Sequence, residues 1–290
     1  MTAQRRLPTW RELHMDTSPE AERMLFAYWR ETPAWQKLER ASQLNRSARQ
    51  LALSGLRRRH PDASPELLQR LLADLLLGPP LAAELYGALP ADCKEPAMAE
   101  PEWLEVTLRV ADVLDGLQVP YVIGGSVASI VHGLIRTTMD VDLVADLKPE
   151  HVAPLVAALR ADFYIDDQTI HQAIERRSSF NLIHLTSMYK VAVFIPKERP
   201  FDRQQLRRRL SQLVAGSART ISVLTAEDVI LAKLDWFRLG GEVSERQWRD
   251  VLGVLKTQGE QLDLAYLQQW AQPLGVSDLL EEALAQLNSA

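Results

Sequence analysis

The stretch GGSVASIVHGLIRTTMDVDLV, residues 124–144, decides how the chain is interpreted. Its second half, MDVDLV, has the alternating polar and apolar pattern of a half-buried β-strand. Successive side chains of a strand point to opposite faces, so Asp140 and Asp142 project together from the same face. Two adjacent carboxylates repel each other, and a divalent cation is a common way to stabilise them.

The first half of the stretch is a glycine turn. Gly124, Gly125 and Ser126 follow the apolar residues 121–123 and precede a short helical pattern. Glycine lets backbone N–H groups approach an anion closely, and a helix N-terminus adds partial positive charge. The two halves together predict a phosphate group held with a metal ion.

Composition narrows the class of protein. The chain has 290 residues, 47% hydrophobic and 24% charged, which is typical of a soluble globular protein of about two domains. Its net charge of −5 argues against a protein that coats nucleic acid. The charge is uneven, with +3 in residues 1–90 and −8 in the remainder. An acidic remainder fits a site that concentrates metal ions.

Cysteine usage and hydropathy predict a cytoplasmic location without membrane partners. Cys93 is the single cysteine, so no internal disulfide can form. The N-terminus has basic residues but no apolar run behind them, so no signal peptide is expected. The longest apolar run, residues 67–78, is too short to span a bilayer.

Residues 1–90 are predicted to form a small helical module. Ser18-Pro19 and Ser64-Pro65 are helix starts, and a long helix is expected from Ala34 to about Arg59. The stripe expected to be buried on this long helix contains Leu38, Ala41, Leu44, Ala48, Leu51 and Leu56. Such stripes need a partner, which is another helix of the module, the following domain or another protein.

The rest of the chain divides by pattern. Residues 91–101 are rich in Pro and Ala and are expected to be a linker. Residues 102–224 alternate helical and strand patterns, with a clear β run at YKVAVFIP, residues 189–196. From residue 225 to 290 the pattern is helical throughout.

The ordered set of strand, Gly-Gly-Ser turn, helix and Asp-x-Asp strand resembles the polymerase-beta-like nucleotidyltransferase superfamily. TAEDVILAKLDWFRLGGEVSERQWRDVLGVL, residues 225–255, resembles the C-terminal helices of bacterial nucleotidyltransferases related to abortive-infection type II toxins. The resemblance covers about residues 103–287. It implies an α+β fold with a mixed sheet, flanking helices and a C-terminal helical part, here preceded by the N-terminal module.

The resemblance also implies a reaction. A nucleoside monophosphate would pass from a nucleoside triphosphate to an acceptor, which is RNA such as tRNA, a protein side chain or a small molecule, with Mg²⁺ or Mn²⁺ as cofactor. The residues implied for catalysis and metal binding are Asp140 and Asp142. Those implied for nucleotide binding are Gly124, Gly125, Ser126, Arg136 and Lys233. Lys233 is equally well explained as a surface lysine.

One position departs from the family pattern. The family usually has Lys-Val-Asp on its third carboxylate strand, whereas this chain has Lys190-Val191-Ala192. Alanine cannot bind a metal, so two interpretations stay open: a nucleotidyltransferase, or a catalytically weakened scaffold that binds a nucleotide or a partner. Other residues that could supply a third ligand are Asp146, Asp166, Asp167 and His184, and the pattern singles out none of them.

Several further residues have two explanations. His132, in the short helix, is expected to be packed rather than catalytic. Arg246 and Asp250 are four residues apart, which predicts an ion pair within one helix, although related toxins have a similar pair near the nucleotide.

The N-terminal module is expected to bind a protein partner or to act as an antitoxin in cis. A basic run is expected to be a solvated helix face or an RNA contact: Arg199, Arg203, Arg207, Arg208 and Arg209.

Overall fold

The computed structural model describes residues 7–14, 17–88, 103–138, 140–213 and 219–288. The chain forms two compact units. The first comprises Met1–Leu38, Gly124–Ile135 and Arg203–Ala290, and the second comprises Glu39–Ile123 and Arg136–Asp202. The predicted linker 91–101 and Cys93 lie outside the described residues. The domain boundaries expected near residues 90 and 224 are predictions about which segments fold independently. The two compact units are defined by contacts within the folded chain, which do not test independent folding, so the boundaries stay predictions.

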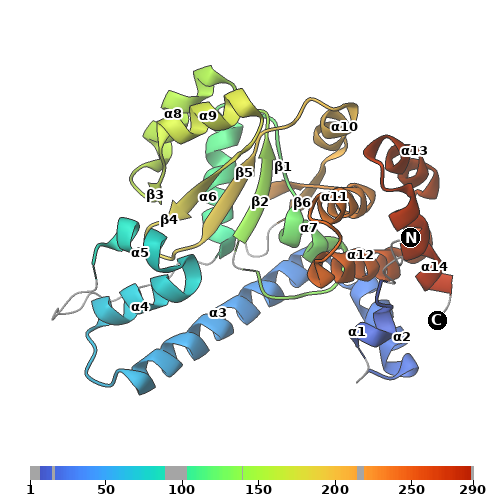
Figure 1. The fold of residues 1–290 in the computed structure, drawn as a ribbon, viewed down its shortest axis with the longest axis horizontal. Helices are drawn as coiled ribbons and strands as arrows, with labels where there is room; N and C mark the ends of the chain where they lie inside the picture. Colours follow the sequence, from blue (N-terminus) through green and yellow to red (C-terminus); the bar gives the residue numbers. More distant parts are fainter. Residues whose placement is uncertain (1–6, 15–16, 89–102, 139, 214–218, 289–290) are drawn as a thin grey trace. The chain divides into compact units, whose positions relative to one another are not determined.

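The second unit is built on a mixed sheet (Figure 1). Its strands lie in the order β3-β4-β5-β2-β1. β2 runs parallel to β5, whereas the pairs β1–β2, β3–β4 and β4–β5 are antiparallel. The strands are β1 (Tyr121–Ile123), β2 (Asp140–Ala145), β3 (Phe163–Tyr164), β4 (Ser179–His184) and β5 (Lys190–Phe194).

Strand β2 has one buried and one partly exposed face. Val141 and Leu143 are buried, whereas Asp140 and Asp142 on the opposite face are half-buried. This is the alternation that the sequence predicts for this strand. Three helices flank the strands: α8 packs against α6 and α9, and α9 packs against β4. They are α6 (Trp103–Gly116), α8 (Pro149–Leu159) and α9 (Asp167–Arg176).

Three helices from the N-terminal part of the chain also belong to the second unit. They are most of α3 (Ala34–Arg59), α4 (Pro65–Leu77) and α5 (Pro79–Tyr86). Their apolar side chains form a cluster that includes Met188, from the loop between β4 and β5. The other buried members are Leu56, Leu68, Leu72, Ala73 and Ala82.

The predicted buried stripe of α3 is confirmed at Leu38, Ala41 and Leu56, which are buried, and is wrong in the middle of the helix. There Leu44 and Leu51 are 46% and 74% exposed, whereas Asn45 and Arg49 are 0% and 2% exposed. The buried side of these middle turns is thus displaced by about one residue, or ~100°, from the predicted one. The physical reason is that both polar side chains bond buried backbone: Asn45 accepts from the Thr138 N–H, and Arg49 donates to the Ser187 carbonyl.

The first unit is mainly helical, and α12 (Glu245–Gln258) packs against several of its helices. These neighbours are α1 (Trp10–Leu13), α2 (Pro19–Glu31), α7 (Gly125–His132), α11 (Ala226–Leu239) and α14 (Ser277–Asn288). A buried ion pair of 2.7 Å between Lys256 and Glu22 joins α12 to α2. The unit also contains most of α10 (Pro200–Arg208), the antiparallel pair β6 (Leu210–Leu213) and β7 (Thr220–Val223), the short helix η1 (Gly259–Gln261) and α13 (Leu264–Leu274).

The expected α+β class is confirmed, with a mixed sheet and flanking helices. The helical pattern predicted after residue 225 is also confirmed by α11 to α14. Among the described residues, no helix combines the length and the apolarity needed to cross a membrane.

The different exposure of two leucines of the predicted stripe of α3 predicts different costs for their substitution. Leu56 is 4% exposed and Leu51 is 74% exposed. Leu56→Ala should lower the free energy of unfolding by about 2–5 kcal/mol because it leaves a cavity. Leu51→Ala should change it by less than about 0.5 kcal/mol. Urea denaturation measures both values, and equal costs would contradict the observed orientation of α3.

Candidate functional site

The two predicted carboxylates lie beside strand β5. In the parallel register Asp140 is opposite Lys190 and Asp142 is opposite Ala192. The Lys190 Nζ lies 3.7 Å from the Asp140 Oδ2, and each of these side chains is 36% exposed. Thr138 Oγ1 donates to the Asp140 carbonyl at 2.9 Å and lies 3.3 Å from its Oδ1. Asp140 is thus held by a cation on one side and by a hydroxyl on the other.

The position where a third carboxylate is expected is filled by a methyl group. Ala192 is 7% exposed and shares its face with Asp142 and with Asn181 of β4, because directly paired residues project from the same face. Nowhere in the described part of the chain do three or more His, Cys, Asp or Glu residues form a group that could hold a metal ion. No third carboxylate therefore joins the aspartate pair there.

The four residues considered as substitutes have other partners. Asp146 forms an ion pair of 2.7 Å with Lys148. Asp166 caps α9 by accepting from the Thr169 N–H at 2.7 Å, and Asp167 accepts from the Gln168 N–H at 2.8 Å. His184 Nδ1 lies 2.8 Å from Ser187 Oγ.

The donor set suits one kind of metal site. Mg²⁺ is usually bound by one or two carboxylates together with water and substrate phosphates, rather than by a complete cage of protein ligands. Asp140 and Asp142, half-exposed on one face, fit that arrangement. They would supply hard oxygen ligands to a cation that a phosphate chain also binds.

The glycine turn begins helix α7 in the first unit. Gly125 has a φ of +49°, in the left-handed region where a side chain is strained. A Cβ added at Gly124 would lie 3.2 Å from a methyl carbon of Leu224. Ser126 is buried, and Arg246 Nη2 of α12 lies within hydrogen-bond distance of its Oγ, at 3.3 Å. The backbone conformation thus favours glycine at 125, whereas a side chain at 124 would require Leu224 to shift.

Lys233 lies in a buried ion pair. Its Nζ is 2.8 Å from Asp250 Oδ2, and the two side chains are 11% and 8% exposed. The alternative that Lys233 is a surface lysine is therefore wrong. On α12, Asp250 contacts Lys233, and Arg246, one turn earlier, contacts Ser126. These contacts join α7, α11 and α12 within the first unit.

His132 is packed, as the sequence predicts. Its Nε2–H donates to the Leu224 carbonyl at 2.7 Å, and its own carbonyl accepts from Gln258 at 2.6 Å. Burial lowers the pKa of His132 to about 4. Lys37, 2% exposed, donates to the Val131 carbonyl at 3.1 Å, and burial lowers its pKa to about 8. Lys37 therefore places a cation at the C-terminal end of α7, where the helix dipole favours it.

The remaining predicted basic residues are spread over both units. Arg136, in the second unit, is half-buried and donates to the Thr137 carbonyl at 3.1 Å. Of the basic run, Arg199 pairs with Asp202 at 2.9 Å, and Arg208 pairs with Glu227 at 3.2 Å. The solvated-face explanation therefore holds for only part of this run.

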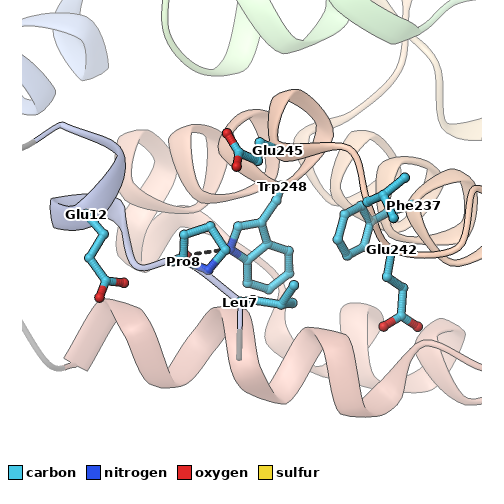
Figure 2. A pocket seen from close by; sticks show the side chains of 8 residues that line it. Leu7, Pro8, Glu12, Phe237, Glu242, Glu245 and Trp248 are labelled. Atoms are coloured by element: carbon cyan, nitrogen blue, oxygen red, sulfur yellow. Dashed lines mark hydrogen bonds between the residues drawn. The ribbon is translucent and has the colours of Figure 1, made fainter. Parts of the chain in front are cut away.

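A cavity of about 390 Å³ lies in the first unit, and its lining contains none of the predicted site residues (Figure 2). Trp248 donates through Nε1 to the Pro8 carbonyl at 2.9 Å and stacks on Phe237 at 5.7 Å between ring centroids. The cavity is thus lined by the N-terminal segment, including α1, and by the segment from the end of α11 to the first turn of α12. Its lining residues are Leu7, Pro8, Glu12, Phe237, Glu242, Val243, Glu245 and Trp248.

Three residues at the aspartate pair were missed by sequence reasoning as site residues. Lys190 stands two residues before Ala192 on the same face, so the strand pattern contained a signal for it. Thr138 and Asn45 carried none, because the contact between them joins residues 93 positions apart.

Comparisons with known proteins add two kinds of similarity. Residues 30–98 match a family model described as Rv0078B-related antitoxin. No curated protein matches the sequence.

Two solved structures are similar in fold. One is an antigenic nucleotidyltransferase-like protein from Paracoccidioides brasiliensis, with 20% identity over 60% of this chain and 91% of that one, and a TM-score of 0.39. The other is the antibiotic-resistance factor ANT(2'')-Ia, with 14% identity over 64% of this chain and 95% of that one, and a TM-score of 0.40. At these values the likeness carries no argument about substrate or mechanism.

The buried neutral His132 predicts an acid-sensitive fold. Its pKa is about 4 in the folded state and 6.5 ordinarily, so between these values the unfolded chain binds more protons. Stability should fall by roughly 3 kcal/mol as the pH drops from about 6.5 to about 4. His132→Gln should flatten this slope in urea unfolding measured against pH, whereas the exposed His60→Gln should keep it. An unchanged slope in His132→Gln would contradict the assignment.

Proposed function

We propose that the protein binds a nucleoside triphosphate together with Mg²⁺ or Mn²⁺ and is nucleotidyltransferase-like in its chemistry. The observation that supports this most is the row formed by Asp140 and Asp142 on β2, half-exposed and on one face. The resemblance of the ordered motifs to the polymerase-beta-like superfamily supports the same proposal. We assign metal binding and catalysis to these two aspartates.

We propose nucleotide-binding roles for five residues. Gly124, Gly125 and Ser126 are proposed to bind phosphate through the backbone at the start of α7. Arg136 and Lys233 are proposed to neutralise triphosphate charge. Lys233 is paired with Asp250, so this role requires it to exchange a carboxylate for a phosphate.

Transfer of the nucleoside monophosphate is proposed to be slow. In nucleotidyl transfer an acceptor hydroxyl attacks the α-phosphorus, the bond to the bridging oxygen breaks, and pyrophosphate leaves. A third carboxylate mainly serves the metal ion that activates the acceptor, while the nucleotide-side metal is held by the carboxylate pair and the triphosphate. Ala192 supplies no ligand, so nucleotide binding is retained more fully than transfer. The acceptor is proposed to be RNA such as tRNA, a protein side chain or a small molecule.

The match of residues 30–98 favours a second candidate function, a toxin-type protein with an antitoxin in cis. Within the second unit these residues contact the ends of the strands. Tyr86 donates to the Leu185 carbonyl at 2.9 Å, and Tyr164 donates to Glu84 at 2.6 Å. If this segment inhibited the site, weakening its packing would raise nucleotide binding.

Isothermal titration with each nucleoside triphosphate and Mn²⁺ tests the proposed function. Wild-type protein should bind at least one nucleotide. Asp140→Ala combined with Asp142→Ala should weaken the affinity by about tenfold or more, a loss of ~1.4 kcal/mol or more. Asp146→Ala is the matched control, since it removes a carboxylate that follows the same strand and should leave the affinity unchanged.

Incubation with each α-labelled triphosphate, Mg²⁺ or Mn²⁺ and total cell RNA and protein identifies the acceptor class. Label transfer that depends on the aspartate pair would support the enzyme, and binding without transfer would support the weakened scaffold. Absence of nucleotide binding by the wild type would contradict both the enzyme and the weakened scaffold.

A further inference from the structure

The backbone just before β2 is held by a side chain from α3. Asn45 is 0% exposed, and its Oδ1 accepts from the Thr138 N–H at 2.8 Å. Thr138 is 2% exposed, and its Oγ1 donates to the Asp140 carbonyl at 2.9 Å and lies 3.3 Å from Asp140 Oδ1. A continuous chain of contacts therefore runs from α3 to the first carboxylate of the pair, entirely within the second unit.

The next turn of α3 holds the neighbouring strand. Arg49 donates through Nη2 to the Ser187 carbonyl, and its guanidinium lies 4.7 Å from the centre of the Tyr189 ring. Tyr189 directly precedes Lys190, whose Nζ faces Asp140. Since β2 and β5 are parallel, they begin at the same edge of the sheet. Two consecutive turns of α3 thus fix the starts of the two strands that carry Asp140 and Lys190.

Packing alone does not explain an amide at position 45. Asn45 Nδ2 is buried and has no hydrogen-bond partner among the residues that the structure describes. A buried donor without a partner costs free energy, which a leucine of similar size would avoid. What the amide provides is an acceptor for the Thr138 N–H, which would otherwise be buried without one.

We propose that Asn45 is a positioning residue for Asp140, acting through Thr138. Resting on the proposed function, this means that the metal–nucleotide site depends on a helix in the segment that matches the antitoxin family model. Hydrogen bonds to a ligating carboxylate fix its orientation, and their loss typically weakens metal affinity by about 10–100-fold. The segment is then a working part of the site and not solely an inhibitor.

Two substitutions break the chain of contacts in the full-length protein, and two others control for stability. Asn45→Leu removes the acceptor, and Thr138→Val removes the hydroxyl while keeping the shape. Thr138→Ser keeps the hydroxyl and should retain the nucleotide affinity and the NMR signals of the wild type. Leu56→Ala destabilises the same helix without touching Thr138 or Asp140, so it shows what lost stability does by itself.

Two readouts separate positioning from stability. NMR should show faster hydrogen exchange of the residue 138 amide in Asn45→Leu, and a shifted carboxyl ¹³C signal of Asp140 in Asn45→Leu and Thr138→Val. Both variants should weaken Mn²⁺-dependent nucleotide affinity by about tenfold. The double variant should be no weaker than either single one, because both break one chain of contacts.

The outcomes are distinct. If Asn45→Leu behaves like Leu56→Ala in both readouts, or raises the nucleotide affinity as an inhibitory segment would, the positioning role is overturned. If the wild type binds no nucleotide with Mn²⁺, the proposed function fails. The NMR signals of residue 138 and Asp140 then still decide whether Asn45 positions Asp140.

Discussion

The parallel pairing of β2 with β5 is the constraint on which the candidate site depends. Its register places Asp140 opposite Lys190 and Asp142 opposite Ala192. On this face of the sheet the Asp140 carboxylate is therefore paired with the Lys190 ammonium group, and the Asp142 carboxylate lies beside the Ala192 methyl group. A shift of the register by one residue would turn both aspartates into the core. The buried Val141, Leu143, Val191 and Val193 on the opposite face oppose such a shift, because each would then be exposed. Packing on one face of the sheet thus places the chemistry on the other.

That register is fixed at its start by polar groups. The segments that lead into β2 and β5 leave backbone groups at the end of the sheet, and α3 satisfies them with Asn45 and Arg49. Buried backbone groups need partners, and here they outweigh the apolarity of Leu44 and Leu51 in deciding which face of α3 is buried. Leu44 and Leu51 are exposed because Asn45 and Arg49 are buried on a different side of the helix.

The sequence was informative where local periodicity reports burial. The alternation in 140–145 and the run at 190–194 predicted both strands, and the glycine turn predicted the start of α7, because these patterns depend on neighbours along the chain. Contacts between distant segments were not predictable in this way. The face of α3, the Lys233–Asp250 pair and the role of Thr138 depend on which segments meet, and a helix with polar and apolar residues on adjacent faces does not reveal which face is buried. Similarly, the spacing of Arg246 and Asp250 gave no indication that Arg246 Nη2 lies within hydrogen-bond distance of Ser126 Oγ, a residue 120 positions away. The pairing of Arg246 with Asp250 stays a prediction.

The central claim of the proposed function is that Asp140, Asp142 and Ala192 form a site at which nucleotide binding is retained and nucleotidyl transfer is slow. The most direct measurement is the rate of pyrophosphate release with Mn²⁺, the nucleotide that the wild type binds, and total cell RNA and protein as the source of acceptor, compared between the wild type and Ala192→Asp. Asn181→Asp, which adds the same charge on the same face one strand further from Asp142, is the matched control. The claim predicts that Ala192→Asp raises the rate by about tenfold or more, a barrier lower by ~1.4 kcal/mol or more, while Asn181→Asp leaves it unchanged. The claim would be contradicted if the rate of pyrophosphate release were the same in all three proteins, or if the wild-type rate already equalled that of Ala192→Asp.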